Sequence, residues 1–146
     1  MRRPDPRSTR TAQQAPAIAR KDHPTMSDFT KLAEQYIAAW NETSPSARRA
    51  LIDEIWSADG RYIDPLAEVT GRDQIDAVIA AAQAQFAGMT FRLAGPVDAH
   101  HDQARFTWEL GPDGTAVVVG FDVAQRDADG RLALVLGFLD KVPSAA

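Results

Sequence analysis

The chain has 146 residues, no cysteine and a formal net charge of −4 at pH 7. Without thiols it has no disulfide framework, cysteine nucleophile or thiolate metal site, and its three histidines lack a zinc-ligand spacing. Residues 1–25 carry six basic and two acidic residues, whereas the remainder carries ten and eighteen. An acidic body argues against nucleic-acid binding, and no stretch is apolar enough to predict a membrane span.

Residues 1–25 differ in composition from the rest of the chain. They contain four prolines, many polar residues and no apolar periodicity, which favours a disordered leader. They lack the apolar segment of a secretory signal. Met26 is an alternative start, because a helix signal follows it directly, and a basic arm that binds a partner is another interpretation. We assign the folded domain to residues 26–146.

Two helices are predicted at the start of this domain. Over residues 29–40 the apolar side chains recur at spacings of three and four, as on one face of a helix. A second helix is predicted over residues 46–56, with Ser46 as its N-cap.

A short strand and a third helix follow. Residues 58–60 indicate a turn, and residues 61–65 a short strand that ends at a proline. Residues 69–73 open the third helix, where Thr70 and Asp73 resemble a capping box.

After Gly88 the apolar period changes from helical to two. This pattern predicts four strands, over residues 90–99, 103–110, 116–126 and 131–141, joined by hairpin loops. The order of elements predicts an α+β fold in which three N-terminal helices pack on a curved, mostly antiparallel sheet that forms a cone with an internal pocket.

Asp122 lies near the centre of an apolar strand. A carboxylate there must face solvent, find hydrogen-bond partners or have a shifted pKa. Alternation places it on the face of Gly120 and Ala124, and places valines and Phe121 on the other face. The second face is the more apolar, so periodicity alone predicts that Asp122 faces water.

Four segments carry a resemblance to a known family. The chain resembles the SnoaL-like branch of the nuclear transport factor 2-like superfamily, a cone-shaped α+β barrel that includes polyketide cyclases, over residues 28–142. The segments are Arg61-Tyr62-Ile63-Asp64-Pro65, Gly71-Arg72-Asp73-Gln74-Ile75, Gly120-Phe121-Asp122-Val123 and Asp129-Gly130-Arg131-Leu132.

The resemblance implies a function and a direction for Asp122. In SnoaL-like cyclases an aspartate on a late strand is the acid/base of an aldol closure that needs no metal or cofactor, and Asp122 matches that position. Its side chain would then line the cavity, against the prediction from periodicity. Tyr62 and Asp64 match a position at the pocket edge. No residue is assigned as the donor that stabilises an enolate oxygen.

The candidate catalytic residues are therefore Asp122, Asp64 and Tyr62. Asp64 has the alternative role of binding nearby backbone N–H groups at a strand end, and Tyr62 that of core packing. Six further residues are expected to line an aromatic pocket or, alternatively, to form a packed core: Trp40, Phe91, Phe106, Trp108, Gly120 and Phe138. His100 and His101 are expected in a solvated turn, without a metal.

The predicted function is that of a cofactor-free acid/base enzyme of the cyclase or isomerase type, acting on an apolar carbonyl compound. The alternative is a non-catalytic ligand-binding or homodimerisation module of the same fold. The expected partners are a small apolar or aromatic ligand and a second copy bound through the sheet, with no nucleic acid and no membrane. The expected location is the cytoplasm.

Overall fold

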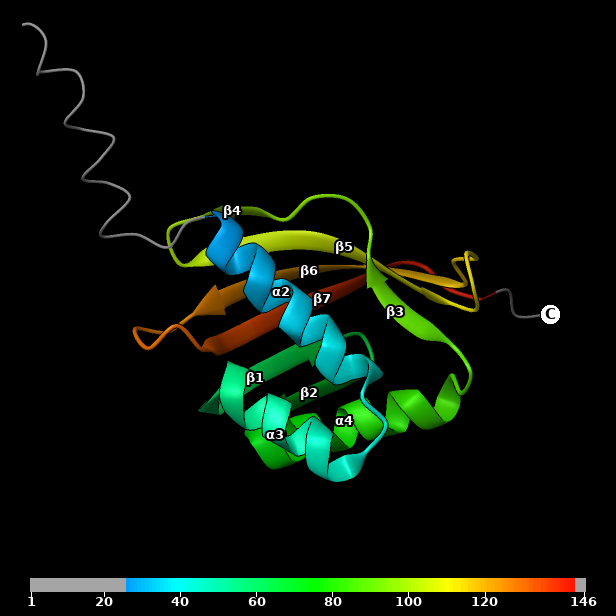
Figure 1. The fold of residues 1–146 in the computed structure, drawn as a ribbon, viewed down its shortest axis with the longest axis horizontal. Coiled ribbons are helices and arrows are strands. Elements are labelled where there is room, and N and C mark those ends of the chain that lie inside the picture. The colour runs from blue at the N-terminus through cyan, green and yellow to red at the C-terminus, as the bar shows by residue number, and fades with distance from the viewer. Residues whose placement is uncertain (1–25, 144–146) are drawn as a thin grey trace, which may run out of the picture.

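The computed structural model describes residues 26–143, so the predicted leader and residues 144–146 lie outside the described range. Within that range, three helices pack against one curved sheet (Figure 1). The helices are α2 (Met26–Asn41), α3 (Pro45–Ile55) and α4 (Arg72–Gln85). None of these described helices has the length and apolar content needed to cross a membrane.

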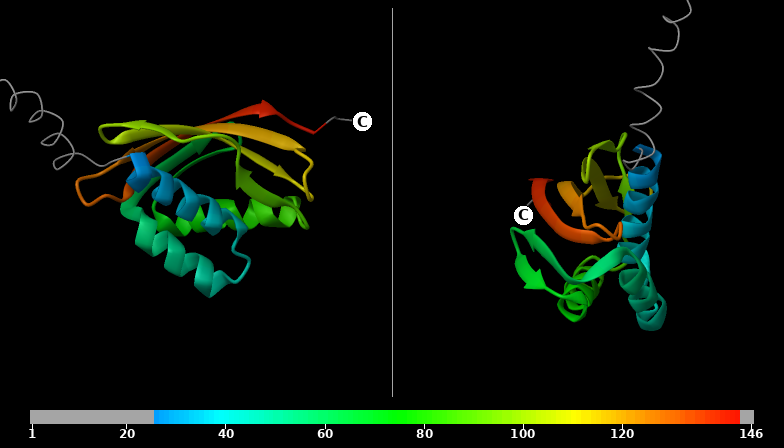
Figure 2. Two further views of the ribbon diagram at one scale, coloured as in Figure 1. Left: turned by 45° about the horizontal axis from the view of Figure 1, so that its top comes forward. Right: turned by 90° about the vertical axis from the view of Figure 1, so that its left-hand side faces the viewer.

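The sheet is mixed and curls around the concave side on which α2 lies (Figure 2). Its strand order is β2-β1-β7-β6-β5-β3, and β4 pairs with β5. Only the β1–β7 pair is parallel among the described pairs. The predicted α+β class is confirmed. The strands are β1 (Trp56–Asp64), β2 (Ala67–Thr70), β3 (Thr90–Leu93), β4 (Asp98–His100), β5 (Gln103–Gly111), β6 (Val118–Arg126) and β7 (Leu132–Lys141).

Two predictions about strands are wrong, and one strand was not predicted. The expected turn at residues 58–60 lies inside β1, where the register against β7 shifts between Trp56 and Arg61. Strand β2, which pairs with the end of β1, was not predicted. The strand expected over residues 90–99 is divided into β3 and β4, because Gly95 has a φ of +92° and Pro96 has no N–H to donate.

Two helix starts also differ from expectation. The N-cap of α3 is Ser44, whose side chain accepts a hydrogen bond from the Ala47 N–H, and Pro45 takes the first helical position that suits its fixed φ. At α4 the N-cap is Gly71, and no side chain caps the helix. The expected capping box at Thr70 is therefore wrong.

The apolar stripe of α2 is confirmed as the centre of the core. Phe29, Leu32, Tyr36, Ile37 and Trp40 are all buried against the sheet. A side chain every third or fourth residue lies on one helix face, which is the face that α2 turns toward the strands.

Strand β6 buries the opposite face from the one that periodicity predicts. Val118, Gly120, Asp122 and Ala124 are buried, and the alternate residues are partly exposed. The reason is that α2 covers the concave side of the sheet, and the small residues leave room beneath it. The more apolar face lies outward, so the expected homodimer through the sheet stays a prediction.

A polar network fixes the helices to one another. The buried Arg48 of α3 pairs with Asp76 of α4 and donates to the Gln83 Oε1 atom at 2.9 Å. The Gln83 amide in turn donates to the Trp40 and Glu42 carbonyl oxygens, at 2.9 and 2.8 Å. These carbonyls at the end of α2 have no intrahelical partner, so the network holds the helix end that carries Trp40.

Arg48→Ala is expected to lower the free energy of unfolding by about 1–3 kcal/mol, because it removes the cation that pairs with Asp76 and the donor to the Gln83 Oε1 atom. Urea denaturation measures this change. The matched control is Arg49→Ala, which removes a neighbouring arginine whose ion pairs are exposed and should change stability little. Equal effects of the two substitutions would contradict the role given to Arg48.

Candidate active site

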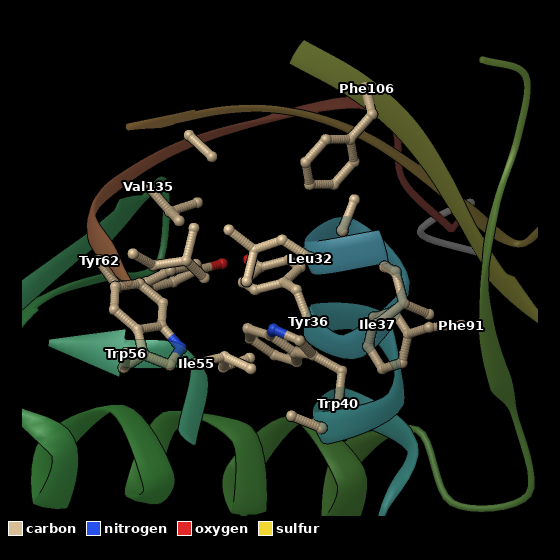
Figure 3. Close-up of a cluster of buried hydrophobic side chains, with 14 of the residues drawn as sticks. Leu32, Tyr36, Ile37, Trp40, Ile55, Trp56, Tyr62, Phe91, Phe106 and Val135 are labelled. Atoms are coloured by element: carbon tan, nitrogen blue, oxygen red, sulfur yellow. The ribbon is translucent and has the colours of Figure 1, made fainter. Parts of the chain in front are cut away.

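A cavity of about 260 Å³ lies between α2, α4 and the concave side of the sheet. Most of its wall is apolar, and Figure 3 shows aromatic rings from the helix and the strands converging on the same interior. Its aromatic residues are Tyr36, Trp40, Tyr62, Phe86, Phe91 and Trp108. Leu66 and Val142 line the cavity and are 76% and 56% exposed, so they mark its mouth.

Asp122 lines this cavity and is only 2% exposed. The Tyr36 hydroxyl donates a hydrogen bond to its Oδ2 atom at 3.0 Å. Its Oδ1 atom has no hydrogen-bond partner among the described residues. Burial therefore removes water from a carboxyl group that receives little compensation, which disfavours the charged form.

Burial raises the pKa of Asp122 to about 7. The Trp108 indole and the Tyr36 hydroxyl oppose this rise, because both stabilise the carboxylate, whereas the negative charge of Asp64 adds to it. The indole exerts its effect without a hydrogen bond of good geometry to either oxygen. A carboxyl group with this pKa can both accept and return a proton near neutral pH.

Gly137 of β7 allows the carboxyl group to lie where it does. It pairs with Asp122 across the β6–β7 ladder. A Cβ atom at this position would lie 2.9 Å from the Asp122 Oδ1 atom and 3.3 Å from the Asp64 Cβ atom. Because glycine has no side chain, the two aspartates flank the same point of the sheet.

Asp64 combines its two predicted roles. Its Oδ1 atom accepts hydrogen bonds from the Leu66 and Ala67 backbone N–H groups, at 2.7 and 2.8 Å, and its Oδ2 atom accepts one from the Tyr62 hydroxyl at 2.6 Å. It also lines the cavity. Three donors stabilise a charged carboxylate, so Asp64 places a negative charge beside Asp122.

The two tyrosines are held as hydrogen-bond donors. Burial raises the pKa of Tyr36 well above its usual value, and the charge of Asp122 raises it further. Burial also raises the pKa of Tyr62, and the charges of Asp122 and Asp64 raise it further. Both phenols are therefore protonated at neutral pH.

Tyr36 is the site residue that sequence reasoning missed as a functional group. It was assigned to the apolar stripe of α2, where it does pack against Trp40 and Phe106. The available signal was its hydroxyl, since a buried tyrosine usually needs a hydrogen-bond partner. Its partner lies 86 residues away along the chain, so local pattern could not identify it.

Apart from Phe138, the predicted lining residues divide into two groups. Trp40, Phe91 and Trp108 line the cavity. Phe106 and Gly120 are buried, Phe106 against Tyr36 and Gly120 beneath Trp108, but neither lines it.

The expectation that Phe138 reaches the interior is wrong, because alternation along β7 turns Gly137 inward and leaves Phe138 57% exposed. His100 and His101 are exposed at the end of β4. Within residues 26–143, no group of three His, Asp or Glu side chains could hold a metal ion.

No lysine, arginine or histidine of the described residues lines the cavity, whereas two carboxyl groups do. An anionic ligand would lose its hydration there without gaining a counter-charge and would be repelled by Asp64. The site therefore disfavours an anionic ligand.

Fold and site together define an α+β domain in which three helices cover a curved, unclosed sheet, with the buried Asp122 carboxyl group on the wall of a largely apolar cavity. The model of the SnoaL-like domain family matches residues 33–135, and the chain belongs to this family. A candidate isomerase of the SnoaL-like family from Agrobacterium tumefaciens is 42% identical, over 79% of this chain and 99% of that one, with a TM-score of 0.75.

More distant structures share the fold alone. A candidate SnoaL-like polyketide cyclase from Jannaschia sp. CCS1 is 17% identical over 80% of this chain and 88% of that one, with a TM-score of 0.64. An LEH-like epoxide hydrolase from M. tuberculosis is 16% identical over 80% and 86%, with a TM-score of 0.57. No curated protein matches the chain.

The raised pKa of Asp122 predicts a pH-dependent stability. The folded state binds this proton more tightly than the unfolded state, whose aspartate titrates near 3.8. The resulting stabilisation is complete below that value and is lost as the pH rises through about 7, a change of about 4 kcal/mol. Asp122→Asn should therefore be more stable than wild type at pH 8, and the difference should shrink toward pH 4.

Urea denaturation across this pH range measures the difference. Asp113→Asn, at an exposed loop position, is the control and should follow the wild-type curve. A constant difference between Asp122→Asn and wild type at every pH would contradict the buried carboxyl group.

Proposed function

We propose that the protein is a cofactor-independent acid/base enzyme that moves a proton on an uncharged, apolar carbonyl compound. The observation that carries this proposal is one buried carboxyl group, Asp122, with a pKa near 7 on the wall of an aromatic cavity. General acid/base catalysis is most effective when the pKa of the catalytic group lies near the working pH. Membership of the SnoaL-like family is consistent with this chemistry.

In the first step the Asp122 carboxylate takes a proton from the carbon next to the carbonyl group. The C–H bond breaks, an O–H bond forms on Asp122, and the electron pair moves into an enolate. In the second step Asp122 returns the proton. Return to a different carbon gives an isomer. Alternatively, the enolate carbon attacks a second carbonyl carbon and closes a ring, the π electrons of that carbonyl move to its oxygen, and the resulting alkoxide takes the proton from Asp122.

Tyr36 supplies a donor for the enolate oxygen. In the free site its hydroxyl donates to the Asp122 Oδ2 atom. Once Asp122 is protonated, the negative charge lies on the enolate oxygen, and a hydrogen bond from Tyr36 is worth more there. The same phenol thus stabilises the charge before and after the proton moves.

Asp64 and Tyr62 have a positioning role in this scheme. The charge of Asp64 raises the pKa of Asp122, and a stronger base removes a proton from carbon more readily. The Tyr62 hydroxyl is committed to Asp64 at 2.6 Å, which keeps this carboxylate fixed at the pocket edge.

The test is deuterium exchange at the α-carbon of an uncharged ketone. With 2-tetralone in D₂O, proton NMR is expected to show exchange that the protein accelerates and that rises with pH to a plateau above about 7, because the ionised form of Asp122 is the base. The exchange rate should be at least about 100-fold lower in Asp122→Asn, whereas Asp113→Asn should retain the wild-type rate.

Binding of ketones without any exchange would contradict the enzyme and support the alternative, a non-catalytic ligand-binding module. Equal exchange rates for wild type and Asp122→Asn would contradict the catalytic role of Asp122.

A further inference from the structure

The Trp108 indole lies against the backbone of Gly120. The two residues are direct partners in the β5–β6 ladder. A Cβ atom added to Gly120 would lie 2.0 Å from Cζ2, 2.2 Å from Cε2 and 2.7 Å from Cη2 of Trp108. Carbon atoms in contact are normally about 3.5–4.0 Å apart, so the ring occupies space that only a glycine leaves free.

The same indole forms part of the cavity wall. Trp108 lines the cavity, and its ring contacts that of Phe91 with centroids 5.4 Å apart and an angle of 62°. Near Asp122 it also acts on the carboxyl group, since it opposes the rise of the pKa of Asp122. One ring thus packs on the strand, lines the cavity and lowers the pKa of the candidate catalytic group.

We propose that Gly120 and Trp108 form the element that sets which ligands the pocket accepts: uncharged ketones of one or two fused rings, bound beside Asp122. This inference deepens the proposed function and rests on it for the ketone class. Gly120 is a positioning residue, because it acts only through the indole. The cavity of about 260 Å³ is slightly smaller than the roughly 300–1,000 Å³ of pockets for drug-sized ligands, which agrees with this size limit.

An added methyl group at Gly120 must displace the indole. To restore normal carbon–carbon contacts the ring has to move by about 1.5 Å. Strand β6 lies on one side of the ring and the cavity on another, so the cavity is the space into which the ring can move. Gly120→Ala therefore reduces the space for a ligand without adding a polar or charged group.

The experiment is isothermal titration calorimetry with 2-tetralone, which has two rings, and cyclohexanone, which has one. Gly120→Ala is expected to weaken binding of 2-tetralone by about 10-fold or more, the cost of overpacking a filled site, and to affect cyclohexanone less. Trp108→Leu, which removes the indole from the cavity wall, should bind 2-acetylphenanthrene, a three-ring ketone, more tightly than wild type does.

The double variant Gly120→Ala/Trp108→Leu separates this role from a damaged strand. Removal of the indole relieves the overlap, so the double variant should bind 2-tetralone within about 3-fold of wild type, or about 0.7 kcal/mol. A double variant that binds as weakly as Gly120→Ala would overturn the proposal, as would a Gly120→Ala variant that binds 2-tetralone like wild type.

A second readout does not depend on ligand. In Gly120→Ala the displaced indole no longer lowers the pKa of Asp122. This pKa should therefore increase above its wild-type value, which carbon-13 NMR of labelled aspartate measures. An unchanged value would contradict the positioning role of Gly120.

Failure of this inference and failure of the proposed function give different results. Wild-type protein that does not bind 2-tetralone overturns the ligand class assigned here. If binding depends on ligand size and the double variant recovers it, but no deuterium exchange occurs, the proposed enzyme activity is refuted. The role of Gly120 and Trp108 in ligand selection then still holds.

Discussion

The structure depends on one constraint, which is the burial of the Asp122 carboxyl group where the described residues offer no cation to pair with it. A buried carboxylate without a counter-charge is costly, so the group either takes up a proton or must be stabilised by dipoles. Here the Tyr36 hydroxyl supplies one hydrogen bond, and the second oxygen atom has no partner among residues 26–143. The outcome is a carboxyl group that is poised between its two protonation states near neutral pH.

The rest of the fold maintains that position. Gly137 leaves room for the carboxyl group and Gly120 for the indole beside it. Helix α2 supplies the Tyr36 donor, and the network around Arg48 fixes the end of this helix. The buried carboxyl group lowers stability as it ionises, and a cost of this kind is common where a site serves function rather than folding.

Sequence predicted the fold better than it predicted the site. The apolar stripe of α2 and the change to a period of two after Gly88 identified the α+β class, because both patterns are local. The face of Asp122 could not be derived from alternation, since the outer face of β6 is the more apolar and the inner face depends on α2 packing over small residues. Tyr36 was missed for a similar reason, because its partner lies on a distant strand.

The most direct test of the central claim is the titration of the Asp122 carboxyl carbon by NMR in wild-type protein, assigned by its loss in Asp122→Asn. A transition near pH 7 would show that the fold holds this group as an acid/base at neutral pH. A transition at the ordinary value for aspartate, about 4, would show that water or another group stabilises the carboxylate, and Asp122 would then be a structural residue.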